Sequence, residues 1–307
     1  MRKLPFIIGV SGGKGGTGKS FVVTNLAALL SQRFKVVLAD IDVEAPNDFL
    51  LLGLEDPGKP EDIRSFFPII DYKKCTACGA CAKVCDNGAI VMSKGKPPMI
   101  MPRLCSGCKA CIYACPYDAI LPGERVTGKL FVRDVSTKIG SFRLVTGMLK
   151  EGEEHTPPVV VYVKRRALEE AKDKDILIID TGAGSGSSIA AAFQESKVLI
   201  AVTEPTPLGA HDLKAILKIA RGSGMRSWMV INRSGIGPEG ELLKIAKEYN
   251  VEKVFRIPYS KEVVLSYARG KLIVAENPNS EPAKVLGKIA EEISMLIMRS
   301  FVGVRGS

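Results

Sequence analysis

Five short apolar runs recur along the chain, and polar or glycine-rich residues follow each of them. They cover residues 6–11, 35–40, 175–180, 197–203 and 227–232. Runs that are apolar at successive positions indicate strands buried on both faces. Stretches with helical apolar spacing alternate with them, at residues 20–31, 208–221, 240–249 and 283–301. This alternation predicts an α/β fold with a mostly parallel P-loop NTPase sheet covered by helices on both faces.

The middle of the chain interrupts the alternation of strands and helices, and this interruption predicts an inserted domain. Residues 56–65 are polar, contain Pro57 and Pro60, and are expected to form a linker into it, while Pro122-Gly123 marks its end. Alternating apolar runs at 129–135, 141–147 and 159–164 then predict an antiparallel extension that joins the insert to the main sheet. We therefore expect a discontinuous main domain, 1–66 and 126–307, around an α+β insert at 67–125.

All eight cysteines of the chain lie in this insert, in two copies of one spacing. The copies are Cys75, Cys78, Cys81, Cys85 and Cys105, Cys108, Cys111, Cys115. A shift of thirty residues also matches Ala80 to Ala110 and Ile90 to Ile120, so the whole segment is a repeat. Disulfides are the first alternative, but no secretory signal is visible; zinc is the second, but its sites usually take cysteines in pairs.

With Pro116 after the last cysteine, the spacing resembles the C-x2-C-x2-C-x3-C-P run of bacterial-type ferredoxins. The resemblance implies two [4Fe-4S] clusters, each taking three ligands from one run and the fourth from the other. It assigns the first cluster to Cys75, Cys78, Cys81 and Cys115, and the second to Cys105, Cys108, Cys111 and Cys85. Asp86 stands where the first run would have its proline, and we expect this acid to lower the potential of the second cluster.

A phosphate-binding loop follows the first predicted strand and opens the first predicted helix. Its residues are Gly13, Lys14, Gly15, Gly16, Thr17, Gly18, Lys19 and Ser20. They satisfy G-x-x-x-x-G-K-S/T, in which the glycines turn backbone amides toward phosphates and the helix N-terminus favours negative charge. Lys19 is expected to bridge the outer phosphates and Ser20 to bind magnesium.

Lys14 indicates which type of phosphate-binding loop this is. The string GGKGGTGKS resembles the deviant P-loop of the MinD, ParA, Mrp and nitrogenase iron-protein ATPases. The resemblance implies a slow, dimer-dependent ATPase that forms a homodimer on binding ATP. In it, Lys14 reaches the partner's phosphates as an arginine finger does.

Further positions match this family in the same order. Asp40 and Asp42 end one predicted strand and Asp180 ends another, where ligands sit in open α/β sheets. By resemblance, Asp42 orients the attacking water, while Asp40 and Asp180 support magnesium directly or through its outer sphere; Asp180 is the alternative water-positioning residue. Residues 181–186 resemble the family's mobile switch II segment.

Two later segments resemble the family's adenine-binding elements. Asn232 and Arg233 follow one strand, and Pro258 lies in the other segment. The asparagine amide is expected to pair with the base edge, although Asn232 could equally cap a turn.

Net charge and hydropathy limit the kinds of partner that this chain is expected to bind. The formal net charge is +10, and two oxidised clusters of about −2 each would lower it to about +6. No basic tail accompanies this surplus, so nucleic acid is not expected. The stretch 283–301 resembles the terminal membrane anchor of MinD relatives, but Glu291 and Glu292 favour a helix docked on the sheet. Reduced cysteines imply a cytoplasmic setting.

These features together predict an ATP-binding and hydrolysing iron–sulfur protein. It would act in nucleotide-gated electron transfer or in metallocofactor or iron–sulfur maturation, on an unknown client. Mrp-type carriers use a bridging C-x-x-C late in the chain, which is absent here, so delivery of a bridging cluster is less favoured. The alternative is a MinD- or ParA-like spatial organiser that binds membrane or DNA, with structural or sensing clusters.

Overall fold

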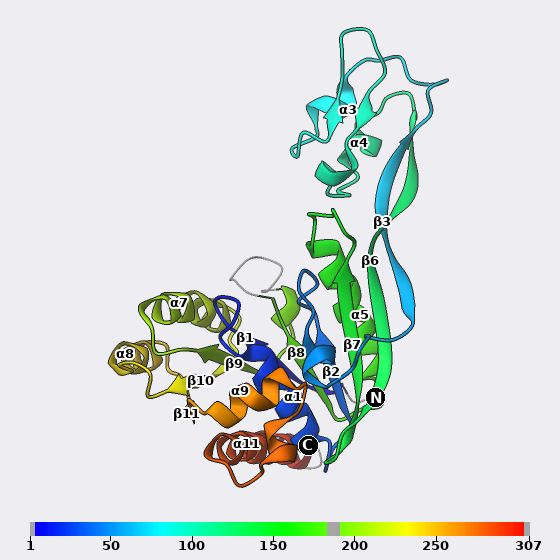
Figure 1. Cartoon of the computed structure of the whole chain (residues 1–307). Coiled ribbons are helices and arrows are strands. Elements are labelled where there is room, and N and C mark those ends of the chain that lie inside the picture. The colour runs from blue at the N-terminus through cyan, green and yellow to red at the C-terminus, as the bar shows by residue number, and fades with distance from the viewer. Residues whose placement is uncertain (1–3, 183–190, 304–307) are drawn as a thin grey trace.

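One large sheet forms the body of the molecule (Figure 1). The computed structural model describes residues 4–182 and 191–303, and within them the sheet has nine strands in the order β11-β10-β9-β1-β8-β2-β7-β6-β3. Their bounds are β1 Phe6–Ser11, β2 Val36–Asp40, β3 Pro60–Ile70, β6 Ile120–Ser136, β7 Ser141–Leu149, β8 Ile176–Asp180, β9 Val198–Thr203, β10 Arg226–Ser234 and β11 Lys253–Pro258. The strands from β11 to β7 are parallel, whereas β6 and β3 are antiparallel to their neighbours. The predicted parallel α/β sheet is confirmed.

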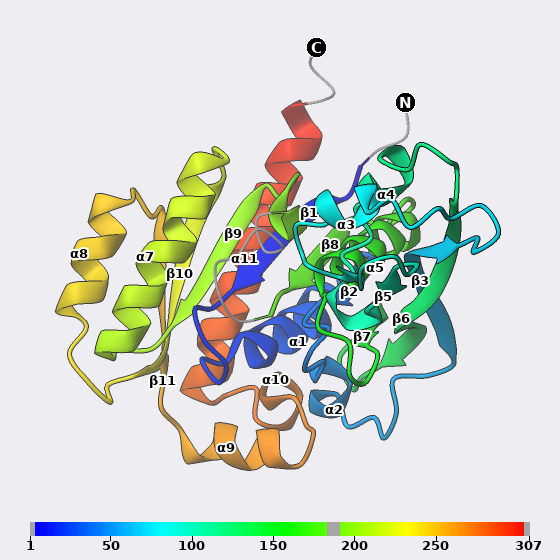
Figure 2. The same ribbon diagram turned by 90° about the horizontal axis from the view of Figure 1, so that it is seen from above.

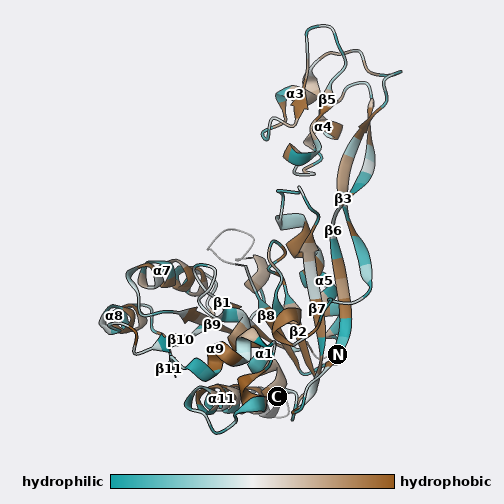
Figure 3. Ribbon diagram, viewed as in Figure 1, coloured by the Kyte–Doolittle hydropathy of each residue, from teal (hydrophilic) through white to brown (hydrophobic). Residues whose placement is uncertain are grey.

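Helices cover both faces because every central strand is apolar on both sides. In β8, Ile176 and Ile178 pack into the core under α1 and α11, while Leu177 and Ile179 pack toward α5. Figure 2 shows these layers from above, and the central strands are coloured mainly as hydrophobic in Figure 3. The helices of the body are α1 Lys19–Leu30, α2 Asp48–Leu51, α5 Pro157–Glu170, α7 Pro207–Gly222, α8 Gly240–Glu248, α9 Lys261–Ala268, α10 Ile273–Glu276 and α11 Glu281–Gly303.

One predicted strand was wrong. The run at 159–164 lies in α5, which begins with prolines at its first positions. Val159, Val160, Val163 and Ala167 are buried, whereas Val161 is exposed. That spacing is helical, so the β-branched residues cover the sheet as one helix face instead of pairing as a strand. The two runs before it do form β6 and β7, as predicted.

A ribbon of two paired strands, and not a linker, connects the insert to the main sheet. Residues 60–65, expected as linker, form the first half of β3, which pairs with β6 from Pro60 opposite Phe131 to Ile70 opposite Ile120. The predicted end at Pro122-Gly123 also lies inside a strand. The ribbon runs out of the main sheet and carries the lobe 71–119, drawn in cyan and blue-green at the top of Figure 1. A paired ribbon holds the lobe in a defined orientation, which a loop could not do.

The lobe is small and internally repeated. Its elements are α3 Ala80–Lys83, β4 Ile90–Val91, β5 Met99–Ile100, the 3-10 turn Pro102–Leu104 and α4 Ala110–Tyr113. Gly79 and Lys109, thirty residues apart, both have positive φ angles and immediately precede α3 and α4. The lobe's core is formed by cysteines and aliphatic residues, with Cys81 and Cys111 buried beside Ile90 and Ile120.

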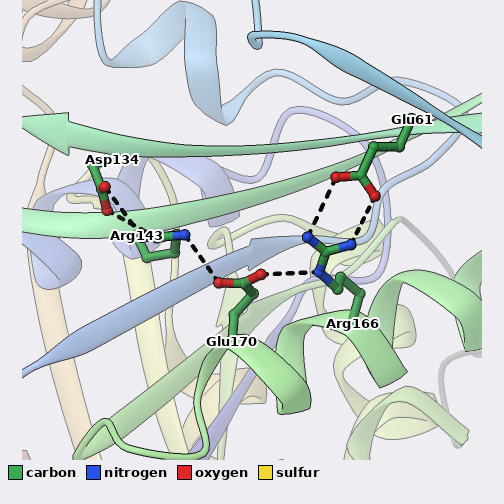
Figure 4. A network of polar contacts seen from close by, with 5 residues as sticks. All are labelled: Glu61, Asp134, Arg143, Arg166 and Glu170. Carbon is green, nitrogen blue, oxygen red and sulfur yellow. Dashed lines mark hydrogen bonds and ion pairs between the residues drawn. The ribbon is translucent and has the colours of Figure 1, made fainter.

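A polar network ties α5 to the base of the ribbon (Figure 4). Arg166 of α5 donates to both carboxylate oxygens of Glu61 in β3, at 2.7 and 3.3 Å. It also donates to Glu170 at 2.9 Å, and Glu170 accepts from Arg143 of β7 at 3.0 Å. Arg143 in turn pairs with Asp134 of β6. The helix, the parallel sheet and the ribbon are therefore joined at one point.

Candidate functional site

The phosphate-binding loop connects β1 to α1 and is tightly packed. Gly16 and Gly18 have φ angles of 87° and 93°, in the left-handed region that favours glycine. A Cβ on Gly13 would collide with Asp212 of α7, so the loop also lies close against that helix. Lys19 is the first residue of α1 and is only 6% exposed. These contacts keep the loop amides at the helix N-terminus, where anions bind.

Two carboxylates meet beside this loop because their strands are neighbours. Asp40 of β2 and Asp180 of β8 lie opposite each other in register. Asp180 Oδ2 accepts a 2.7 Å hydrogen bond from Ser20 Oγ. Asp40 accepts from the backbone amides of Asp42, Asn47 and Asp48, at 3.0 to 3.2 Å. Asp40 thereby shapes the turn after β2, while Asp180 faces the hydroxyl expected to bind magnesium.

Asp48 belongs to the same cluster and was missed from the sequence. It is the first residue of α2 and is fully buried, with its carboxyl group next to that of Asp180. Burial and the neighbouring charge of Asp40 raise its pKa well above the usual range. Burial likewise raises the pKa of Asp180 to about 6 and that of Asp40 well above its ordinary value. No motif contains Asp48, and only the fold brings it here.

This cluster suits a hard cation that shares its ligands with phosphate. Asp180 Oδ1 is buried without a partner, and anionic oxygens are the ligands magnesium prefers. No three histidine, cysteine, aspartate or glutamate side chains of the described residues converge closely enough to hold a single metal ion. Magnesium beside a nucleotide needs no such cage, because it keeps waters and takes phosphate oxygens.

Asp42 lies close enough to Lys19 for their charges to interact, in a hollow next to the loop. Burial raises its pKa, and the positive charge of Lys19 opposes the rise. The hollow is also lined by Gly15, Thr181, Gly182 and Ala192, by Thr156 just before α5, and by Val160 of α5. Residues 183–186 of the predicted switch segment lie outside the described residues. Lys14 is half-buried at the start of the same loop.

A larger pocket of about 370 Å³ extends from the loop toward the end of β11. Its walls include all three residues expected at adenine, Asn232, Arg233 and Pro258, together with Tyr259 and Tyr267. This volume suits a nucleotide-sized ligand. Tyr267 comes from α9, an element with no recognisable motif, so the sequence alone did not reveal it.

Asn232 has a second attachment that the sequence did not predict. Its Nδ2 donates a 2.8 Å hydrogen bond to the backbone oxygen of Thr17, and a Cβ on Gly18 would collide with the same amide. Arg233 forms an ion pair with Glu204 at 2.8 Å. Asn232 therefore stabilises the phosphate-binding loop through its side-chain amide.

The eight cysteines gather around two hollows in the lobe. One hollow is lined by Cys75, Cys78, Cys81 and Cys115, and the other by Cys85, Cys105, Cys108 and Cys111. In each hollow three cysteines come from one run and one from the other. The amide of Ala89 donates to Cys85 Sγ at 3.2 Å, and the amide of Ala119 donates to Cys115 Sγ at 3.3 Å. The crossing cysteine of each run is thus held in the same way.

The thiols in each hollow are close enough to affect one another's ionisation. Burial raises the pKa of Cys81, and the charges of Cys115 and Cys75 raise it further. Burial and the neighbouring Cys105 and Cys108 raise that of Cys111 to about 11. Thiolates held close together repel one another, and a bound cationic metal centre offsets that repulsion.

Comparison with known proteins agrees with the fold and with the nucleotide site. Residues 8–273 match the family described as the CobQ/CobB/MinD/ParA nucleotide binding domain. The chain belongs to this family of P-loop ATPases. Among solved structures, the cell division ATPase MinD of Pyrococcus furiosus aligns with a TM-score of 0.58 and 21% identity. That alignment covers 96% of this chain and all of the MinD chain, and it reflects a shared fold.

Relatives in sequence include proteins that are named for iron–sulfur clusters. The protein MJ0579 of Methanocaldococcus jannaschii is 34% identical over 271 residues, covering 88% of this chain and 92% of its own. An iron–sulfur cluster carrier protein of Aquifex aeolicus is 26% identical, covering 95% of this chain and 68% of its own. The cytosolic Fe-S cluster assembly factor Nubp2 homolog of Aedes aegypti is 25% identical, covering 96% and 98%.

Among the described residues, none of the helices combines the length and the apolar character needed to cross a bilayer.

Proposed function

We propose that this ATPase is an iron–sulfur protein in which the nucleotide state controls electron delivery from the lobe to a client protein. The observation that carries the proposal is the gathering of the eight cysteines into two crossed sets on a ribbon of the ATPase sheet. The clusters would supply one-electron chemistry. The ribbon would transmit movements of the nucleotide site to the lobe.

The lobe would hold two [4Fe-4S] clusters with the predicted crossed ligands. Cys75, Cys78, Cys81 and Cys115 would bind the first, and Cys105, Cys108, Cys111 and Cys85 the second. In support, the same two sets surround the two hollows, and the Ala89 and Ala119 amides orient a crossing sulfur in each. The domain bounds of 67–125 for the insert remain part of this proposal.

At the nucleotide site, each residue would have the role that its position supports. Residues Gly13 to Ser20 would wrap the phosphates of ATP with Lys19 as the bridging cation. Ser20 and Asp180 would bind magnesium directly or through its waters, and Asp40 would position the turn that carries Asp42. Asp42 would orient the attacking water. Asn232, Arg233 and Pro258 would border adenine.

Hydrolysis would require two copies of the chain. Lys14 is half-buried near the start of the loop and lines neither the Asp42 hollow nor the larger pocket, which suits a phosphate contact made across a homodimer. ATP binding would then close the dimer, and hydrolysis would reopen it.

Iron–sulfur cluster delivery is the second candidate, favoured by the relatives named as carriers and assembly factors. Against it, all eight cysteines lie between residues 75 and 115, in sets of four that leave none for a bridging site. Incubation with an iron chelator separates the two candidates. An electron-transfer protein keeps its clusters, whereas a carrier loses about half or more of its iron in an ATP-dependent way.

Three experiments test the main proposal. Protein purified without oxygen should contain about eight irons and eight sulfides per chain. Paired substitutions then test the crossed ligands. Cys85→Ala with Cys108→Ala should leave about four irons, because both remove one cluster, whereas Cys85→Ala with Cys78→Ala should leave almost none. The reverse pattern would refute the crossing. Midpoint potentials that are identical with Mg-ADP and with a non-hydrolysable ATP analogue would refute nucleotide gating.

A further inference from the structure

The two halves of the lobe are equivalent in sequence but differ in what surrounds them. We call the hollow of Cys75, Cys78, Cys81 and Cys115 the first hollow, and that of Cys85, Cys105, Cys108 and Cys111 the second hollow. Phe66 and Pro68 of β3 also line the second hollow. Lys109 Nζ lies 5.5 Å from the centre of the Phe66 ring, and a Cβ on Gly107 would lie 3.2 Å from the Phe66 carbonyl oxygen. The second cysteine run is therefore packed against the ribbon.

The same half of the lobe also touches the body of the molecule. At Gly152, in the loop between β7 and α5, an added Cβ would lie 3.2 Å from Arg103 Nη2. Arg125 of the ribbon strand β6 forms an ion pair with Glu153 of that loop, whose side chain is 2% exposed. In Figure 1 the ribbon enters the lobe from the side of the body. The second half of the lobe thus faces other parts of this chain, which leaves less of it open to a partner.

At the first hollow, a turn takes the place of the ribbon. The turn 92–98 joins β4 to β5, and its two end residues line the first hollow. A shift of thirty residues matches Pro68 to Pro98 and Phe66 to Lys96. Both prolines are buried, but Phe66 is half-buried under its neighbours whereas Lys96 is exposed. The first half of the lobe is therefore open to solvent where the ribbon covers the second.

Two tyrosines lie on this open side. Tyr117 lines the first hollow and is 48% exposed, whereas the residue at the equivalent position of the second hollow is Asn87. The amide of Asp71 donates a 2.8 Å hydrogen bond to the carbonyl oxygen of Ala119, which also lines the first hollow. Tyr72 follows directly and is 63% exposed. Large aromatic side chains with a polar tip are typical anchors of protein interfaces.

Four lysines accompany the tyrosines. Lys73 and Lys74 follow Tyr72, Lys94 and Lys96 lie in the turn 92–98, and all four are exposed. Among residues 4–182 and 191–303, every ion pair joins residues outside 71–119. The acids next to these segments are Asp71, which accepts from the amide of Lys73, and Asp118. The lysines therefore outnumber the acids and keep their charges available.

We infer that this open rim, formed by Tyr72, Lys73, Lys74, Lys94, Lys96 and Tyr117, is the docking surface for a client protein with an acidic surface. The inference rests on the proposed function and names the kind of client. Carboxylates of the client would pair with the lysines and steer the encounter, while an apolar spot would pack on the tyrosines. One electron would leave the reduced first cluster and reduce a one-electron acceptor in the client.

A protein fits this rim better than a nucleic acid does. Proteins that bind single strands use a basic groove that follows the backbone over several nucleotides, whereas these lysines surround one hollow. A bound cluster would add negative charge inside the lobe, so that an anionic partner meets attractive charge only at the rim. A short acidic patch satisfies this arrangement.

Reversal of two rim charges tests the docking in reduced holoprotein. The probe is rubredoxin, a small acidic protein whose single iron accepts one electron, mixed by stopped flow. Its rate of reduction should fall as salt is added, and Lys73→Glu with Lys94→Glu should lower it about tenfold at low salt. Arg103→Glu with Arg64→Glu is the matched control, because it makes the same charge change on the ribbon side of the lobe. An equal loss in both variants, or in neither, overturns the inference.

A basic acceptor separates docking from damage to the clusters. Cytochrome c should be reduced no more slowly by the Lys73→Glu, Lys94→Glu variant than by the wild type, with the iron content unchanged. Slower reduction of both acceptors would mean that the substitutions harm electron transfer itself, which contradicts a role in docking.

The apolar part of the rim has its own test. Tyr117→Asn gives the first hollow the residue that the second hollow has at the equivalent position. At high salt, where charge attraction is screened, this variant should reduce rubredoxin several-fold more slowly than the wild type. An unchanged rate there removes Tyr117 from the docking surface.

Binding without electron transfer keeps the inference distinct from the proposed function. Zinc-substituted rubredoxin accepts no electron, and calorimetry at low salt should show it binding about tenfold more weakly to the Lys73→Glu, Lys94→Glu variant than to the wild type or the control. If the wild type reduces neither acceptor, the proposed electron delivery fails, while this binding still decides whether the rim receives acidic proteins. A labelled single-stranded oligonucleotide that binds more tightly than rubredoxin, and only when the rim is intact, would assign the rim to nucleic acid instead.

Discussion

Lys19 is the buried cation around which the acidic side chains of the nucleotide site are arranged. Its charge opposes the pKa rise that burial imposes on both Asp42 and Asp180. It therefore stabilises the site before any nucleotide arrives, and it supplies the positive charge that outer phosphates need.

Lys19→Ala and Asp42→Ala should separate binding from turnover. Loss of Lys19 removes a charge-assisted contact worth about 1.5–3 kcal/mol, so ATP affinity should fall about 10- to 100-fold. Asp42→Ala should bind ATP about as tightly as the wild type and hydrolyse it far more slowly, because the attacking water loses its acceptor. Calorimetry and phosphate release measure the two effects. Normal hydrolysis by Asp42→Ala would move the water-positioning role to Asp180.

Asn232→Ala should weaken the phosphate-binding loop itself. The substitution removes the 2.8 Å bond to the Thr17 carbonyl and leaves that buried oxygen unpaired, at a cost of about 1–3 kcal/mol. We expect a lower melting temperature without nucleotide and weaker binding of inorganic triphosphate, which has no adenine. Ile236→Ala, at an exposed position just after β10, is the control. If only adenine-containing ligands bind more weakly, Asn232 acts on the base alone.

The acidic cluster should make the nucleotide-free protein less stable as the pH rises. The pKa of Asp180 is about 6 in the fold against an ordinary value of 3.8, so the native state binds this proton more tightly than the unfolded chain. Stability should therefore decrease from about pH 4 through about pH 6, with Asp40 and Asp48 acting in the same direction. Urea unfolding of magnesium-free protein between pH 5 and 7.5 measures the slope. Asp180→Asn should flatten it, and a slope of the opposite sign would contradict the prediction.

At the scale of elements, α5 connects more parts of the molecule than any one motif predicts. Its buried face packs on the sheet through Val163 and Ala167, and its polar face joins the network of Figure 4 through Arg166 and Glu170. Its N-terminus follows the Glu153 loop. A helix fixed in these ways moves as one body with the ribbon base.

Paired substitutions in α5 distinguish helix from strand. Val161 is 56% exposed and Val163 is fully buried, so Val163→Ala should cost about 2 kcal/mol. Val161→Ala should be neutral or slightly stabilising, since alanine has the higher helix propensity. In a strand these two residues would share one face, and both substitutions would then be equally harmful. Denaturant midpoints decide between the two patterns.

At the scale of the whole molecule, the role proposed for Lys14 predicts that ATP hydrolysis depends on a second chain. Lys14→Ala should bind ATP with nearly unchanged affinity, yet it should fail to dimerise productively and to hydrolyse ATP. Sedimentation with ATP, together with specific activity measured over a range of protein concentrations, tests this. Wild-type activity that does not depend on concentration down to the nanomolar range would indicate that a single chain suffices.

Much of this protein could be read from local sequence, because its chemistry is concentrated in short motifs. The string from Gly13 to Ser20 specifies a loop, a helix start and a phosphate ligand within eight residues, since glycine conformation and helix polarity act locally. Continuous apolar runs likewise predicted β1, β2, β8, β9 and β10. The cysteine spacing predicted which thiols gather in the two hollows.

Other features depended on contacts between distant segments. The run at 159–164 has strand-like composition, but burial against the sheet makes it a helix, because tertiary packing overrides a weak local preference. The polar residues 60–65 become a strand only because β6 pairs with them. The sequence by itself thus determined the family, the loop and the cysteine sets, all set by short-range chemistry. Only the tertiary structure decided that Asp48 joins the acidic cluster and that Arg125 meets Glu153, since burial and charge pairing arise between residues far apart in the chain.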